Sequence, residues 1–150
     1  MMNLGFNEAR KTMNQNIGGP FGAVITDKDD NVIAVASNTV LGTCDPTAHA
    51  EINAIRKACS ILKTHDLTGY KIYATGYPCP MCLSAIIWAN IKDVYYGTDL
   101  QDAEIIGFRD DFIYEYLNGE RKEILNIKQI NRDECLKLFE EYILKDKEIY

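Results

Sequence analysis

The sequence predicts a three-layer α/β/α fold, in which a central mixed five-stranded sheet carries helices on both faces. Three observations favour it. The chain of 150 residues has the length of one domain. It opens with two short β-type runs joined by an acidic turn, and helical segments then alternate with strands. Because no repeat, low-complexity tract or Pro/Gly/Ser-rich linker divides the chain, we expect a single domain over residues 1–150.

The N-terminal third predicts one helix and a hairpin. Apolar residues at helical spacing indicate a short amphipathic helix over residues 4–13, which the Gly-Gly-Pro of residues 18–20 ends. Residues 21–26 and 32–36 are short β-type runs. The turn-forming residues 27–31 join them, so the two runs are expected to pair as a hairpin.

The remainder of the chain alternates helices and strands. Residues 48–62 carry apolar side chains at helical spacing, residues 70–75 have the pattern of a strand, and residues 81–91 are apolar nearly all round, as in a buried helix. The pattern then predicts a strand at 94–96, a helix at 102–117, a strand at 124–130 and a helix at 133–144. Right-handed crossovers would place the two middle helices on the same side of the sheet, with their N-termini at the edge where α/β proteins bind ligands.

The composition is that of an acidic globular protein. Sixteen Lys and Arg against 22 Asp and Glu give a formal net charge of −6 and a pI near 4.9, which disfavours a nucleic-acid partner. No apolar run approaches the roughly 18 residues of a membrane span, so no membrane partner is expected and the cytoplasm is the expected compartment. The five cysteines, an odd number, favour metal binding or catalysis over a disulfide framework.

Two motifs carry the chemistry, one at the start of each middle helix. His49 and Glu51 belong to a His-Ala-Glu motif, and Cys79 and Cys82 belong to a Pro-Cys-Pro-Met-Cys motif. One imidazole and two thiolates suit zinc, and three protein ligands leave a fourth position for water. We therefore expect one Zn²⁺ per chain, with Glu51 as the catalytic residue that takes the water's proton and passes it to a leaving nitrogen. A structural zinc clip, or a zinc-binding interaction module without enzymatic activity, is the alternative, but neither needs Glu51.

The same motifs resemble the cytidine deaminase-like superfamily and, within it, the bacterial guanine deaminases. The resemblance runs through residues 18–25, 45–51, 54–59, 78–82, 107–114 and the tail at 147–150. It implies that residues 1–150 form one zinc-dependent deaminase domain, which converts guanine to xanthine and ammonia by hydrolysis in purine catabolism or salvage. A tRNA-specific adenosine deaminase and a free cytosine deaminase stay as alternatives, because both share the zinc chemistry.

The resemblance also implies how a small nucleobase substrate is held. Asp110 is the expected acceptor for the N1–H and exocyclic amine of guanine, while the Asn38 amide and the backbone N–H of Ala50 would bind ring acceptors. Phe21 and Tyr150 would cover the faces of the ring. In the resembled enzymes the C-terminal tail closes the pocket of the other subunit in a domain-swapped homodimer, so Tyr150 is expected to act in the partner's site.

Two residues depart from the family's pattern. Tyr77 stands before Pro-Cys, where the family has Glu, and Arg109 stands before Asp110, where the guanine enzymes carry an acid. Both are expected near the pocket, where either could shift the ring preference. For Arg109 the alternative is an ion pair with a neighbouring surface acid.

Overall fold

A mixed four-stranded sheet, in the order β2-β1-β3-β4, is the framework that positions the site. In the computed structural model, which describes residues 1–150, β1 (Gly22–Thr26) pairs antiparallel with both β2 (Val32–Ser37) and β3 (Lys71–Gly76). The edge strand β4 (Asp93–Thr98) runs parallel to β3. The predicted hairpin and the two strands that follow it are therefore confirmed, with bounds that shift by one or two residues.

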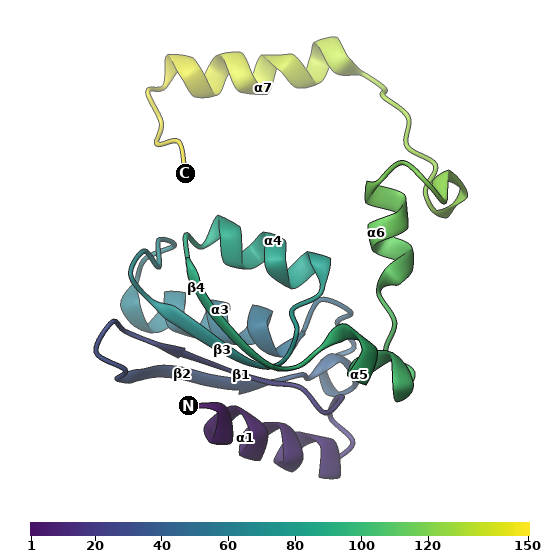
Figure 1. Cartoon of the computed structure of the whole chain (residues 1–150). Coiled ribbons are helices and arrows are strands. Elements are labelled where there is room, and N and C mark those ends of the chain that lie inside the picture. The colour runs from purple at the N-terminus through teal and green to yellow at the C-terminus, as the bar shows by residue number, and fades with distance from the viewer. The chain divides into compact units, whose positions relative to one another are not determined.

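Helices cover both faces of this sheet, as the three-layer prediction requires (Figure 1). α1 (Met2–Asn14) packs on one face, and α3 (Ala50–Leu62), with α4 (Pro80–Trp88) beside it, lies on the other. The central strand β1 is buried over its whole length, and small and aliphatic side chains from helices and strands close the core around it. Since α4 connects β3 to the parallel β4, it lies on the same side as α3, and the N-termini of the two helices meet.

Two glycines let α1 lie directly on β1. A Cβ added to Gly22 would stand 2.0 Å from the carbonyl oxygen of Gly5, and both residues are buried. No side chain fits at position 22 unless the helix moves away from the strand. This close contact fixes the start of β1, and with it Phe21, the predicted site residue that directly precedes the strand.

The predicted fifth strand, at residues 124–130, is wrong. No residue after Thr98 belongs to a strand: a 3₁₀ turn spans Lys122–Ile124, and residues 125–130 are in neither a helix nor a strand. A strand is stable only when other strands take up its backbone hydrogen bonds and its apolar face is covered. The apolar pattern of this segment says which side chains would share a face, but not whether a sheet edge is available to it.

The predicted helix at 102–117 is two helices, α5 (Leu100–Ile105) and α6 (Asp111–Leu117). Gly107 has a φ of +96° and turns the chain between them. A further short helix, α2 (Val40–Thr43), lies in the loop after β2, where no helix was predicted. Both differences matter for function, because these segments line the cavity described below.

The chain divides into two compact units, Met1–Tyr114 and Glu115–Tyr150. The first unit contains the whole sheet. The second contains the end of α6, the 3₁₀ turn and α7 (Arg132–Leu144), which agrees with the predicted helix at 133–144. No helix of either unit is long and apolar enough to cross a membrane. A single functional domain over residues 1–150 stays a prediction.

Candidate active site

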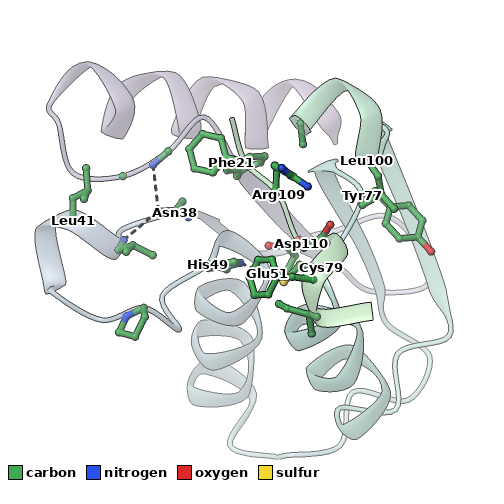
Figure 2. A pocket seen from close by; sticks show the side chains of 18 residues that line it. Phe21, Asn38, Leu41, His49, Glu51, Tyr77, Cys79, Leu100, Arg109 and Asp110 are labelled. Carbon is green, nitrogen blue, oxygen red and sulfur yellow. Dashed lines mark hydrogen bonds between the residues drawn. The ribbon is translucent and has the colours of Figure 1, made fainter. Parts of the chain in front are cut away.

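Three metal-binding side chains meet where α3 and α4 begin. His49 is the N-cap residue of α3, Cys79 is the N-cap residue of α4, and Cys82 lies in the first turn of α4. Nδ1 of His49 is 3.6 Å from the Sγ atom of each cysteine, and the three ligand atoms lie within 4.8 Å of one another. Figure 2 shows His49 and Cys79 facing each other from the two helices. The crossover thus brings together two motifs that are far apart in the sequence.

These distances and this chemistry fit zinc. With bonds of about 2.0–2.1 Å to nitrogen and 2.3 Å to sulfur, a nitrogen and a sulfur ligand at the tetrahedral angle lie about 3.5 Å apart. One imidazole and two thiolates form the soft ligand set that zinc favours. His49, Cys79 and Cys82 are therefore positioned to bind one zinc ion. Three protein ligands leave one tetrahedral position for water, as in catalytic zinc sites.

The site stabilises a thiolate before any metal binds. A hydrogen bond from Cys82, together with the adjacent His49 ring, lowers the pKa of Cys79 to about 4 against the opposing effect of burial. The same hydrogen bond raises the pKa of the Cys82 thiol, and burial raises it further. The N-termini of α3 and α4 add partial positive charge at this point. A metal that binds here must displace any proton that remains on these thiols, so its affinity depends on pH.

Glu51 lies in the first turn of α3, two residues after His49, and is only 7% exposed. Burial raises the pKa of its carboxyl, and the negative charge of Cys79 adds to the shift. Its side chain also lines the cavity, so a small molecule can reach it (Figure 2). A buried carboxyl with a raised pKa beside metal ligands is able to accept a proton and to return it.

A cavity of about 610 Å³ opens over these residues, with all of its lining residues in the first unit. His49, Glu51 and Cys79 line one part of it, and most of the remaining surface is apolar. The apolar wall comes from the loop after β2 and from α5 and α6, and includes Val40, Leu41, Pro46, Leu100, Ala103, Phe112 and Ile113. A polar centre with an apolar wall suits a flat heterocycle, whose edges are polar and whose faces are apolar.

Asn38 lines the cavity with the orientation of its amide fixed. Its Oδ1 accepts hydrogen bonds from the backbone N–H of Gly19, at 3.2 Å, and of Val40, at 3.1 Å (Figure 2). Because both partners are donors, the oxygen and the nitrogen of the amide cannot be exchanged. The NH₂ group is therefore the end of this side chain that can donate to a ligand.

Asp110 follows the turn after α5 and lines the same cavity as Glu51 and Cys79 (Figure 2). Partial burial raises the pKa of its carboxyl, and the negative charge of Cys79 adds to the shift. The neighbouring Arg109 forms the ion pair that was given as the alternative for it, with Nη2 at 2.6 Å from Oδ2 of Asp111. Arg109 also lines the cavity, and the carboxylate of Asp111 balances its charge.

Tyr77, the other departure from the family's pattern, lines the cavity as well. Its ring packs edge-to-face against Tyr96, with the ring centroids 5.0 Å apart, and its backbone N–H donates to the carbonyl oxygen of Thr98 at 2.8 Å. The side chain is 38% exposed, which places it at the margin of the cavity. An effect of Tyr77 on ring preference stays a prediction.

The first unit contains every predicted site residue except Tyr150. Ala50 is fully buried at the start of α3, between His49 and Glu51. Tyr150 ends the second unit, and its role at the site stays a prediction. Sequence reasoning missed the apolar cavity residues of the α5–α6 segment, above all Phe108. The only signal for it was that Phe108 lies within the resembling stretch, at residues 107–114.

Comparison with known proteins agrees with this geometry. Residues 1–98 match the family model of the cytidine and deoxycytidylate deaminase zinc-binding region. The chain is 49% identical to guanine deaminase of Bacillus subtilis (strain 168) over 111 residues, which cover 74% of this chain and 70% of that protein. The X-ray structure of guanine deaminase from Bacillus subtilis superposes with a TM-score of 0.92 at 40% identity, over 99% of this chain and 96% of that one.

A tRNA-specific adenosine deaminase is similar too, at lower identity. The protein of Haemophilus influenzae is 31% identical over 129 residues, which cover 86% of this chain and 73% of that protein. The part of the chain that matches the family model runs from α1 to β4 and includes all three zinc ligands. The chain therefore belongs to the zinc-binding cytidine and deoxycytidylate deaminase family.

Proposed function

We propose that this chain catalyses the hydrolytic deamination of guanine to xanthine and ammonia, with one zinc ion as its cofactor. The observation that carries the proposal is the carboxyl of Asp110 in the cavity that Glu51 and the zinc ligands line. Guanine presents N1–H and its exocyclic amine side by side, and a carboxylate accepts hydrogen bonds from both. Adenine and cytosine present a ring acceptor beside the amine, which would face the carboxylate unfavourably. In the cytoplasm, the reaction would serve purine catabolism or salvage.

The chemistry assigns Glu51 two proton transfers. When bound, zinc lowers the pKa of a water molecule toward about 7 and so supplies the nucleophile at neutral pH. Glu51 takes a proton from that water as its oxygen attacks C2 of guanine, and C2 becomes tetrahedral. Glu51 then gives the proton to the exocyclic nitrogen and ammonia leaves as the C2–N bond breaks; the remaining hydroxyl proton moves to N3, which leaves the C2 carbonyl of xanthine. The raised pKa of Glu51 suits a carboxyl that must hold a proton between the two steps.

Donors and aromatic rings around the cavity support the same substrate. Two backbone amides hold the Asn38 side chain so that its NH₂ group is the available donor. A ring nitrogen or the ring carbonyl of guanine can accept a hydrogen bond from it. The backbone N–H of Ala50, at the N-terminus of α3, is a second candidate donor. The ring of Phe21 lines the cavity and can cover one face of the base.

The activity is tested by measuring ammonia release from guanine, cytosine, adenine, guanosine and a tRNA anticodon stem-loop in parallel, with the zinc-loaded full chain. We expect ammonia from guanine alone. Release from the stem-loop instead would favour the adenosine deaminase alternative, which the similarity to the Haemophilus influenzae protein keeps open. Release from cytosine would mean that Asp110 does not select the base.

Replacing Asp110 with asparagine should reduce activity on guanine specifically. The introduced amide would turn a donor toward the N1–H and amine donors of the base, and an unpaired buried donor costs about 1–3 kcal/mol, or about 5- to 150-fold in kcat/KM. Zinc content and thermal stability should stay unchanged. The matched control is Asp29→Asn, the same change in the exposed turn between β1 and β2. An equal loss on every base that the enzyme accepts would show that Asp110 is structural.

The domain-swapped homodimer, in which Tyr150 covers the base in the partner's cavity, is the second part of the proposal. It is tested by complementation between two inactive variants, Glu51→Gln and Tyr150→Ala. A mixed dimer would contain one site with an intact Glu51 and an intact Tyr150 from the other protomer. We therefore expect activity to appear on mixing and unfolding–refolding the two variants together. If activity never appears, Tyr150 does not act across subunits.

A further inference from the structure

We propose that Phe108 is a positioning residue for Asp110. Its ring lies against Gly19 and Phe21 and thereby fixes the turn between α5 and α6, so that the carboxyl of Asp110 faces the cavity. This inference rests on the proposed function, because it assigns Phe108 its effect through the residue that reads guanine.

The surface that receives Phe108 is rigid. The backbone N–H of Phe21 donates to the carbonyl oxygen of Gly19, and its carbonyl oxygen accepts from the N–H of Asn38, both at 2.9 Å. Behind the ring, a Cβ added to Gly76 would lie only 3.4 Å from two ring atoms of Phe21. The backbone of Phe21 is thus hydrogen-bonded on both sides, and its ring lies beside Gly76 of the neighbouring strand β3.

The segment that carries Asp110 has few anchors of this kind. Neither α5 nor α6 contains a buried residue. The ion pairs of Arg109 with Asp111 and Glu104 join residues of the same segment, so they stiffen it without tying it to the sheet. An exposed segment without buried apolar side chains is expected to move easily. A contact with the rigid part of the fold is therefore needed to hold Asp110 in place.

Phe108 supplies that contact. Its ring packs edge-to-face on Phe21, with centroids 5.0 Å apart and an angle of 89° between the planes. Within the segment, Phe108 N–H donates to the carbonyl oxygen of Ala103 at 3.0 Å, which closes the turn at Gly107. Asp110 is two residues further on, and its carbonyl oxygen accepts from the N–H of Ile113 at 3.0 Å. Only Arg109 separates these two hydrogen-bonded residues, so a displacement of the Phe108 ring reaches Asp110 over two residues of backbone.

Gly19 offers an independent way to displace the same ring. A Cβ at this position would lie 3.1 Å from Cζ of Phe108, closer than an ordinary contact, and 3.3 Å from the ring of Phe21. Gly19→Ala therefore keeps the phenyl ring of Phe108 but crowds its contact with the Phe21 ring, so that one of the two rings must shift. If Phe108 acts by position, Gly19→Ala should produce a defect of the same kind as Phe108→Ala, and a smaller one.

The first experiment compares kcat and KM for guanine in the zinc-loaded variants. Phe108→Ala is expected to lower kcat/KM by about 10- to 100-fold, as a displacement of about 1 Å at a positioned group can do. Gly19→Ala should lower it in the same direction but by less, because its Cβ displaces the ring only slightly. Because Glu51 and the zinc ligands stay in place, most of the loss should appear as a higher KM, with zinc content unchanged. Phe108→Leu should restore most of the activity. The control is Ile105→Ala, an 81% exposed residue of α5 that does not line the cavity; it should match the wild type.

The second experiment asks whether Phe108 acts through Asp110. If it does, the double variant Phe108→Ala/Asp110→Asn should be no worse than Asp110→Asn alone, because the group that Phe108 positions is already lost. If the two losses multiply, Phe108 is only a wall of the cavity that touches the base, and the inference is overturned.

Hydrogen exchange separates this inference from the proposed function. Backbone amides of residues 106–112 should exchange faster in Phe108→Ala and Gly19→Ala than in the wild type or in Ile105→Ala, with no substrate present. Should the wild type fail to act on guanine while exchange rises as expected, the proposed function fails but the anchoring role of Phe108 stands. Unchanged exchange in both variants would overturn the anchoring role whatever the substrate is.

Discussion

Glu51→Gln is expected to keep zinc bound and to lower kcat for ammonia release from guanine by about 100- to 10,000-fold. The amide has the shape of the carboxyl but cannot take a proton from water or return it to the leaving nitrogen. Folding should be unaffected, because burial disfavours a charge at position 51 and the amide carries none. The measurements are zinc content by atomic absorption and steady-state turnover of the same preparation.

The matched control for this substitution is Glu8→Gln, the same chemical change on α1, where Glu8 pairs with Lys11 outside the cavity. It should leave both zinc content and kcat unchanged. Normal turnover in Glu51→Gln would reverse the assignment of Glu51 as the proton carrier. Loss of zinc in that variant would instead make the Glu51 carboxyl part of the metal site.

The sequence predicted the zinc site well because each half of it is local. His49 and Glu51 lie within one helical turn, as do Cys79 and Cys82, and side-chain directions within a turn follow from helix geometry alone. Bringing the two halves together required only the handedness rule for crossovers, which holds for almost all parallel strand pairs. The observed 3.6 Å separations are therefore the result of two local patterns and one general rule.

What the sequence did not predict depends on contacts between distant residues. The apolar pattern at 124–130 is compatible with a strand, but a strand needs an edge to pair with, and no pattern within the segment specifies one. The break at Gly107 depends on a positive φ that glycine permits without requiring. The contact of Phe108 with Phe21 joins residues that are far apart in the sequence, and an exposed phenylalanine in a short turn gives no sign of it.

Cys79→Ala is expected to abolish both zinc binding and turnover. The substitution removes the ligand whose pKa is lowered by the hydrogen bond from Cys82 and by the adjacent His49 ring, which favours the thiolate form that binds metal. His49 and Cys82 then offer only two ligand atoms, which cannot hold a tetrahedral zinc ion tightly. Without zinc no acidified water forms, so activity should fall below detection. Cys44→Ala, which removes an exposed cysteine outside the cavity lining, is the control and should keep both properties.

The thermal response to zinc distinguishes the loss of the metal from the loss of the fold. A ligand that binds only the folded state stabilises it, by about 2.7 kcal/mol at a hundred times its Kd. Added zinc should therefore raise the Tm of the wild type after treatment with a chelator, and that of Glu51→Gln equally, but not that of Cys79→Ala. In this pattern Glu51→Gln binds zinc but is inactive, whereas Cys79→Ala binds no zinc. Only a catalytic zinc accounts for both results. If the zinc only stabilised the fold, replacing Glu51 would not change the activity. Equal activity of Glu51→Gln and the wild type would therefore identify a structural zinc clip.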